Sequence, residues 1–221
     1  MTGEPMSDST DKLIDSIAGG LAPVRRLRPP MLRALGAVVV AAIVIALLTM
    51  WRGFRADMPE RMEDPGYWVQ VIGAALTGIA GTIAAFQLSL PDRSRAWAAL
   101  PMVPVALWLT GFAGGCLMHW IAIPSDAPVM EDSKRCLTTI VLATIPVSFV
   151  LWSMLRRARP LHPTGTAWLA ALAVAGFADT AHLLLHVVQA SALVLLVNLV
   201  PVSIIVLAGG LGGRKGMNPI A

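Results

Sequence analysis

The chain has few of the charged residues that cover the surface of a soluble domain. Only 14% of its 221 residues are charged, whereas 56% are hydrophobic, and the mean hydropathy is +0.71. A soluble domain usually carries about 25% charged residues, so this composition excludes a water-exposed surface over most of the chain. Two cysteines also exclude a disulfide-rich secreted scaffold.

Recognisable catalytic machinery is missing as well. The sequence contains no nucleophile elbow, phosphate-binding loop, C-x-x-C pair or H-E-x-x-H helix. It also lacks the matched broken helices of many transporters. We therefore expect that the protein is not an enzyme and that it needs no cofactor. A redox- or metal-linked membrane transporter or thiol oxidoreductase remains the alternative, because cysteines and histidines are present.

Six long apolar stretches dominate the sequence. About 20 apolar residues, at 1.5 Å per residue, cross a hydrocarbon core of roughly 30 Å. The pattern predicts an all-α membrane protein with a six-transmembrane-helix bundle (residues 31–211), a segment before it (residues 1–30) and a short tail (residues 212–221). The predicted spans are Met31–Trp51, Tyr67–Leu88, Trp97–Trp120, Cys136–Leu155, Gly165–Leu185 and Ala190–Leu211.

The positive charges predict the orientation of these spans. Twelve of the 17 Lys and Arg residues fall on one side: Lys12, Arg25, Arg26, Arg28, Arg33, Arg93, Arg95, Arg156, Arg157, Arg159, Arg214 and Lys215. Cytoplasmic loops carry the excess of Lys and Arg, so both termini are expected to lie in the cytoplasm. The opposite loops hold seven acidic residues, which agrees with this topology. The arginines near the membrane can also contact anionic lipid headgroups of the bilayer.

The segment before the first span has an amphipathic pattern. Leu13, Ile14, Ile17 and Leu21 recur at helical spacing, with Asp11, Lys12 and Asp15 on the other face. The basic sequence P-V-R-R-L-R-P-P follows and contains Arg25, Arg26 and Arg28. A helix this short is marginal in water. Its apolar stripe therefore needs a partner, which is either another protein or the membrane surface.

Both cysteines fall near the side opposite the termini. Cys116 lies near the end of the third span, and Cys136 opens the fourth. The pair is compatible with a structural disulfide, with redox or metal sensing, or with inert thiols. His119 stands three residues after Cys116, and thiolate and imidazole ligands suit zinc, cadmium or copper. Cys116, His119 and Cys136 are thus candidate metal ligands, and the cysteines are candidate redox sensors.

Three polar residues lie on one face of the fifth predicted span. Asp179, His182 and His186 follow an i, i+3, i+7 spacing. A carboxylate within a span costs roughly 2.5–3.5 kcal/mol on insertion scales, so it usually faces the bundle and has a partner. Two interpretations are open: a polar staple between helices, or a group that responds to protons or metal.

Five stretches of the sequence form a recognisable series. They are L-I-D-S-I-A-G-G-L-A-P-V-R-R-L-R-P-P at Leu13–Pro30, F-Q-L-S-L-P-D-R-S-R-A-W at Phe86–Trp97, G-C-L-M-H-W at Gly115–Trp120, S-K-R-C at Ser133–Cys136 and M-L-R-R-A-R-P-L-H-P at Met154–Pro163. Their order and positions cover nearly the whole chain. Together they resemble the NrsF-like family of six-span bacterial anti-sigma factors.

The resemblance implies a partner, a signal and a cellular location. Members of this family hold an extracytoplasmic-function (ECF) sigma factor at the bacterial inner membrane and release it when outward-facing cysteines meet oxidants or heavy metals. Cys116 and Cys136 match the family's cysteine positions. Direct contact with nucleic acid is not implied. The sigma-binding residues would be Leu13, Ile14, Ile17, Leu21, Arg25, Arg26 and Arg28.

Overall fold

The computed structural model describes residues 6–20, 28–122, 129–158, 160 and 163–185, and every regular element within these ranges is helical. The sixth predicted span lies outside the described residues, so the count of six is not tested. The elements are α1 (Met6–Gly19), α2 (Pro30–Arg52), α3 (Met58–Met62), α4 (Pro65–Leu88), the 3-10 helix η1 (Arg95–Ala99), α5 (Met102–Ala122), α6 (Val129–Arg156) and α7 (Pro163–Leu185).

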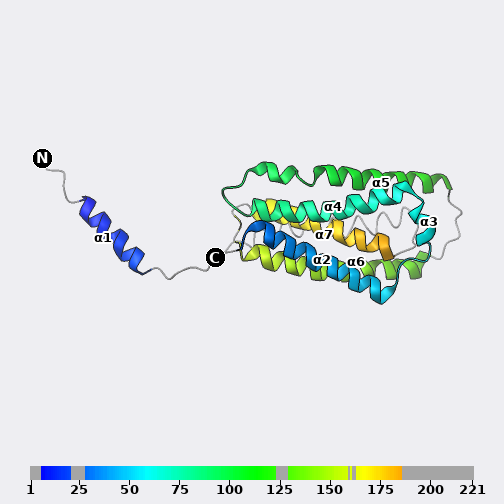
Figure 1. Cartoon of the computed structure of the whole chain (residues 1–221), viewed down its shortest axis with the longest axis horizontal. Helices are drawn as coiled ribbons and strands as arrows, with labels where there is room; N and C mark the ends of the chain where they lie inside the picture. Colours follow the sequence, from blue (N-terminus) through cyan, green and yellow to red (C-terminus); the bar gives the residue numbers. More distant parts are fainter. Residues whose placement is uncertain (1–5, 21–27, 123–128, 159, 161–162, 186–221) are drawn as a thin grey trace.

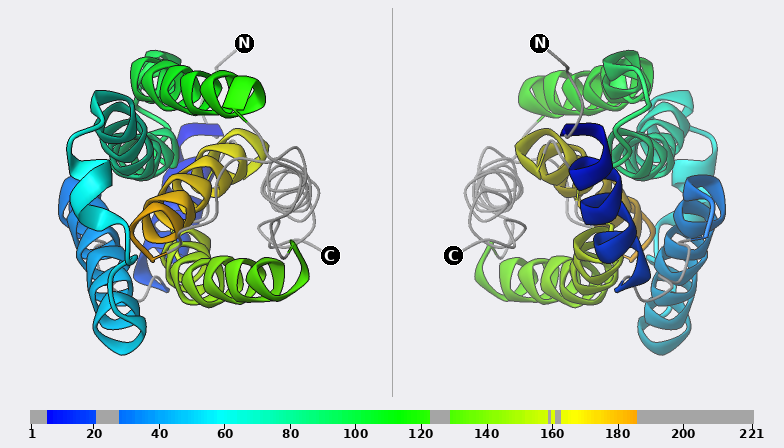
Figure 2. Two further views of the ribbon diagram at one scale, coloured as in Figure 1. Left: turned by 90° about the vertical axis from the view of Figure 1, so that its right-hand side faces the viewer. Right: turned by 90° about the vertical axis from the view of Figure 1, so that its left-hand side faces the viewer.

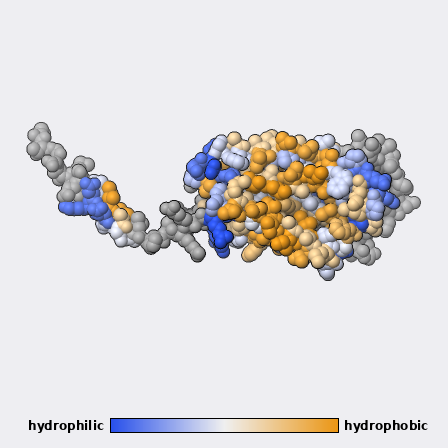
Figure 3. Space-filling model, in the orientation of Figure 1, coloured by the Kyte–Doolittle hydropathy of each residue, from blue (hydrophilic) through white to orange (hydrophobic). Residues whose placement is uncertain are grey.

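Three helices are long and apolar enough to cross a membrane, namely α2, α4 and α7. They match the first, second and fifth predicted spans to within two residues. The 23 residues of α2 give a length of about 35 Å at 1.5 Å per residue. The surface of the bundle carries a broad apolar belt with hydrophilic residues at both ends (Figure 3). This distribution indicates that the protein is associated with a membrane.

The third predicted span does not form one helix. Residues Arg95–Ala99 make the separate 3-10 turn η1, and α5 begins only at Met102. Pro101 marks the boundary, because proline has no amide hydrogen to donate while its carbonyl accepts the first α5 hydrogen bond, from the Val105 amide at 2.9 Å. The prediction that this helix starts at Trp97 is therefore wrong.

Helix α6 extends beyond the start of the fourth predicted span. Helix α6 starts at Val129, seven residues before Cys136. Its extra turns carry Glu131, Lys134 and Arg135, which are good helix formers but not membrane-core residues. Hydropathy marks the apolar part of a helix and misses a polar extension of this kind.

Helices α4 and α7 form the centre of the bundle (Figures 1 and 2). Glycines allow their backbones to approach closely, as in other membrane helices. A Cβ added at Gly176 would lie 2.6 Å from the Ala74 carbonyl oxygen, and one at Gly78 would lie 2.7 Å from the Phe177 ring. A Cβ at Gly81 would meet the Ala173 amide nitrogen at 3.1 Å. No larger residue fits at Gly176 or Gly78 without a shift of the helices.

The remaining helices pack around this pair. Helix α5 packs on α4 through Gly73 and Gly111. A Cβ added at Gly73 would lie 2.5 Å from the backbone nitrogen of Trp108, and one added at Gly111 would lie 2.7 Å from the backbone nitrogen of Gln70. Helices α2, α4, α6 and α7 share one buried cluster that includes Ala37, Phe86 and Leu151. In both views α5 and α6 lie on opposite sides of α7 (Figures 1 and 2).

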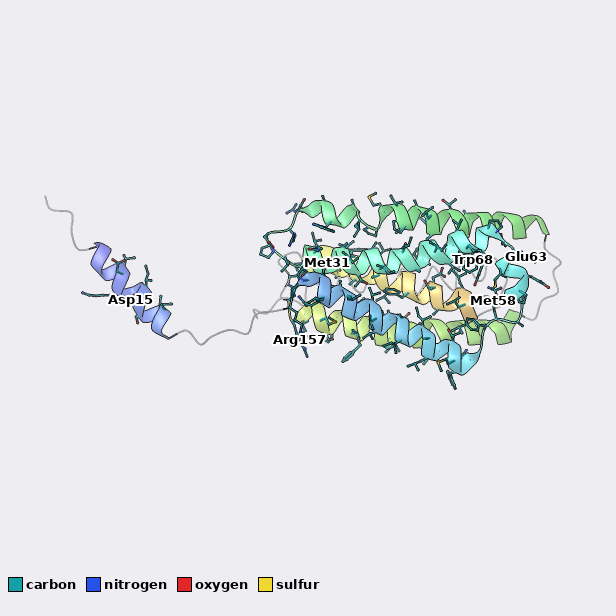
Figure 4. All side chains as sticks on the ribbon, viewed as in Figure 1. Asp15, Met31, Met58, Glu63, Trp68 and Arg157 are labelled. Atoms are coloured by element: carbon teal, nitrogen blue, oxygen red, sulfur yellow. The ribbon has the colours of Figure 1, made fainter. Side chains whose placement is uncertain are left out.

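The bundle has two distinct ends. The elbow end is where α2 begins, and the α3 end is where α2 finishes. Figure 4 shows Met31 and Arg157 at the elbow end, with Met58, Glu63 and Trp68 at the α3 end. Helix α1 lies away from the bundle, beyond the elbow end (Figure 1).

Enlarging Gly176 tests the central contact. We expect Gly176→Ala to lower the free energy of unfolding by about 1–3 kcal/mol, the usual cost of overpacking, because the new methyl group would meet α4 backbone atoms. The measurement is thermal unfolding of the purified protein in detergent. Gly36→Ala is the matched control, since an added Cβ there has nothing within 4 Å. Equal melting temperatures for the two variants would contradict the packing described.

Candidate functional site

Helix α1 presents an apolar stripe that the bundle does not cover. Leu13, Ile14 and Ile17 are 60%, 56% and 58% exposed. Figure 3 shows the apolar and hydrophilic sides of this helix. The sequence predicted such a stripe, with Asp11, Lys12 and Asp15 on the other face, and these polar residues are exposed too. An exposed apolar stripe on a helix is suited to a groove on a partner protein or to a membrane surface.

The basic residues that follow α1 are only partly described. Arg28 is exposed and stands two residues before α2. Leu21, Arg25 and Arg26 lie outside the described residues. The stripe and Arg28 are therefore the part of the predicted sigma-binding segment that the structure places.

A buried arginine holds the first turns of α2 to two other helices. Arg33 is 8% exposed and donates a hydrogen bond to the Met154 carbonyl of α6. Its guanidinium carbon also lies 4.9 Å from the centre of the Phe86 ring in α4, within the range of a cation–π interaction. The position of α2, which directly follows the basic segment, is thus fixed at the elbow end.

A second buried arginine lies at the α3 end. Arg55 is 7% exposed and makes two hydrogen bonds to the Asp57 carboxylate, from Nε at 2.6 Å and from Nη2 at 2.7 Å. Arg61 lies 3.4 Å from the same carboxylate. A bidentate pair of this geometry is among the stronger ion pairs in proteins.

Arg55 also binds the C-terminal turn of α7. Its amide donates to the Leu184 carbonyl and its Nη1 donates to the Leu183 carbonyl, both at 3.2 Å. The Tyr67 hydroxyl donates to the Leu183 carbonyl at 3.3 Å. These hydrogen bonds join the segment after α2 and the start of α4 to the last described turn of α7.

The ion pair sets the titration of Asp57. Its hydrogen bond with Arg55 lowers the pKa of Asp57 below its usual value, against the opposing effect of burial. Asp57 therefore remains a carboxylate at any ordinary pH, and the contact with Arg55 persists.

The intramembrane carboxylate joins two helices. Asp179 of α7 accepts a hydrogen bond of 2.7 Å from the indole nitrogen of Trp108 in α5. This hydrogen bond is a polar contact between two helices, which is one of the two interpretations that the sequence left open. His182 is buried one turn further along α7, whereas His186 lies outside the described residues.

The candidate metal and redox residues are placed only by their backbones. Cys116 and His119 lie in the last turns of α5, and Cys136 lies in the second turn of α6. Both helices run so that these turns belong to the α3 end (Figure 1). The described residues bring no three His, Cys, Asp or Glu side chains together as metal ligands, but the side chains of these three residues are not among them.

Sequence reasoning missed the structural roles of four residues: Arg33, Arg55, Asp57 and Trp108. One signal was available for Arg33, because a charge inside a predicted span usually needs a partner. Trp108 and Arg55 have partners 71 and 128 positions away, which sequence spacing does not reveal. The partners of Asp57 are Arg55 and Arg61, which lie close to it in the sequence.

These observations define a membrane-associated helical protein that presents an amphipathic helix outside its bundle. The chain belongs to the NrsF family, described as "Negative regulator of sigma F", which matches residues 17–217. This confirms the family resemblance seen in the sequence. The family is regulatory rather than enzymatic.

One curated relative also matches part of the chain. The protein named anti-sigma-F factor NrsF from Caulobacter vibrioides (strain NA1000 / CB15N) is 33% identical over 90 residues, which is 40% of this chain and 42% of the relative. The match thus spans less than half of the relative's length. No solved structure matches the chain.

Asp57→Asn tests the half-buried ion pair and its pH dependence. A carboxylate with a lowered pKa in the folded state stabilises the fold above its ordinary pKa, and this contribution is lost as the pH falls through the lowered value. At neutral pH we expect the variant to lose about 1–3 kcal/mol of stability, and the difference from the wild type should shrink below about pH 4. The measurement is thermal unfolding in detergent between pH 3 and pH 7. Glu63→Gln, at an exposed carboxylate of the same loop, is the control. A constant difference across that pH range would contradict the assignment.

Proposed function

We propose that the chain is a multi-pass inner-membrane anti-sigma factor that binds an ECF sigma factor through its N-terminal segment and keeps it from RNA polymerase. The observation that carries the proposal is the exposed apolar stripe of α1 in a chain of the NrsF family. The proposal also rests on what the name of the Caulobacter relative states.

The stripe has the properties of a binding element. A helix of 14 residues gains little stability from its own hydrogen bonds in water. Burial of Leu13 and Ile17 in an apolar groove would stabilise both the helix and the complex, at about 1.5–3 kcal/mol for each fully buried side chain. Arg25, Arg26 and Arg28 would then contact acidic residues beside the groove. A soluble sigma factor is the macromolecule that such an element would hold at the membrane.

The distribution of charged and apolar residues over the bundle supports the membrane orientation expected from the sequence. The exposed arginines Arg28, Arg93, Arg95, Arg156 and Arg157 lie in segments at the elbow end, and the apolar belt separates them from the α3 end (Figure 3). By the positive-inside rule the elbow end faces the cytoplasm, where a sigma factor works. The α3 end then faces the periplasm.

The release signal acts at the cysteines in this proposal. Cys116 and Cys136 belong to the α3 end, which faces an oxidising compartment. An oxidant would take two electrons and two protons from the two thiols to form a disulfide, or a soft metal ion would bind the thiolates together with His119. Either reaction would couple the end of α5 to the start of α6.

The apolar stripe is tested with the full-length protein in membranes. We expect Leu13→Asp combined with Ile17→Asp to reduce co-purification of one of the host's ECF sigma factors at least about tenfold, since two buried apolar side chains are lost. Transcription from promoters of that sigma factor should rise. Asp11→Asn, on the other face of α1, is the matched control and should bind like the wild type. Capture that is unaffected by the two aspartates, or no capture by the wild type, would contradict the proposal.

The cysteines are tested separately. A Cys116→Ser, Cys136→Ser variant should bind the sigma factor normally but should no longer release it when cells are treated with hydrogen peroxide or cadmium chloride. The measurement is the ratio of reporter transcription with and without treatment, which we expect to fall to about one. An induction ratio equal to that of the wild type would refute the sensor role and leave sigma binding intact. Metal flux or thiol oxidation by the protein without residues 1–22 would instead favour the transporter or oxidoreductase alternative.

A further inference from the structure

Arg55 lies where three parts of the bundle meet. It follows α2 by three residues, pairs with Asp57 of the connecting segment and binds the end of α7. We infer that Arg55 and Asp57 form a joint that transmits a change at the α3 end to α2, and through α2 to the N-terminal segment. This inference rests on the proposed function and identifies how that function is regulated.

The connection from α2 to the joint is short. Only Gly53 and Phe54 separate the last residue of α2 from Arg55. Gly53 has a φ of 80°, a left-handed conformation that favours glycine, and its amide still binds the Thr49 carbonyl at 2.8 Å. With so little chain between them, a displacement of Arg55 pulls on the end of α2.

The joint holds α7 through backbone atoms. Two hydrogen bonds from Arg55 and one from Tyr67 end on the carbonyls of Leu183 and Leu184. The Arg55 guanidinium carbon also lies 5.8 Å from the centre of the Tyr67 ring in α4. While these contacts persist, the ends of α2, α4 and α7 keep one arrangement.

Helix α5 reaches the same turn of α7. Asp179, which binds Trp108 of α5, lies one helical turn before Leu183. Cys116 lies eight residues after Trp108 on α5. A displacement of α5 therefore acts on α7 through the Trp108–Asp179 hydrogen bond, next to the carbonyls that Arg55 holds.

The other end of α2 is also tied. Arg33 bonds to Met154 and stacks on Phe86 at the elbow end, a few residues after the basic segment. A displacement of α2 along its axis therefore strains the Arg33 contacts, which position the start of α2. The signal changes sigma binding only to the extent that it favours one arrangement of these contacts over the other.

The test compares variants that weaken the joint with one that weakens the fold elsewhere. Asp57→Asn removes the ion pair, and Tyr67→Phe removes one hydrogen bond to α7. Gly81→Ala overpacks the α4–α7 contact at Ala173, ten residues before Leu183 and so away from the joint. Sigma factor bound per molecule of full-length protein is measured in untreated cells by co-purification, alongside the melting temperature of each variant.

If the joint transmits the signal, Asp57→Asn and Tyr67→Phe should release sigma without any treatment. The amount of bound sigma should fall at least about fivefold for Asp57→Asn, which is the lower end of the range of allosteric coupling. Gly81→Ala should keep its sigma even where its melting temperature is lower. Wild-type occupancy in Asp57→Asn and Tyr67→Phe, or equal release by Gly81→Ala, would overturn the inference.

The same experiment separates the inference from the proposed function. Leu13→Asp with Ile17→Asp is measured in parallel. Loss of sigma in that variant together with wild-type occupancy in Asp57→Asn refutes the joint alone. Sigma occupancy that is unchanged in the stripe variant refutes the proposed function, whatever the joint variants show.

Discussion

The close contact between α4 and α7 is the constraint on which the rest of the bundle depends. Gly78, Gly81 and Gly176 bring the two backbones together, and no hydrophobic driving force does this inside a lipid bilayer, where packing and hydrogen bonds must suffice. Among the described residues, the long helices α2, α5 and α6 each pack against one or both of these two. The glycines therefore hold together the two helices against which α2 and α5 pack.

Three of the polar contacts around this pair join segments that are distant in sequence. Arg33 connects α2 with α6, Asp179 connects α7 with α5, and Arg55 connects the segment after α2 with α7. A buried charge is costly unless its partners are all in place, so such contacts favour discrete arrangements over gradual deformation. That property is what a regulator needs if it has one state that holds its partner and another that releases it.

The sequence predicted what depends on local pattern. Apolar length predicted α2, α4 and α7 closely, and helical spacing predicted the stripe of Leu13, Ile14 and Ile17. It did not predict the break at Pro101, because hydropathy continues across the proline, nor the polar start of α6. The partners of Arg55 and Asp179 depend on the packing of helices that lie far apart in the chain, and a single sequence does not contain that information in any local form.

The central claim is that this protein holds a sigma factor at the membrane through its N-terminal segment. The most direct measurement is the distribution of the host's ECF sigma factors between membrane and soluble fractions, in cells with the full-length protein and in cells whose copy lacks residues 1–20. The account predicts that one sigma factor is found in the membrane fraction with the full-length protein and in the soluble fraction with the shortened one. The same distribution in both strains would contradict it.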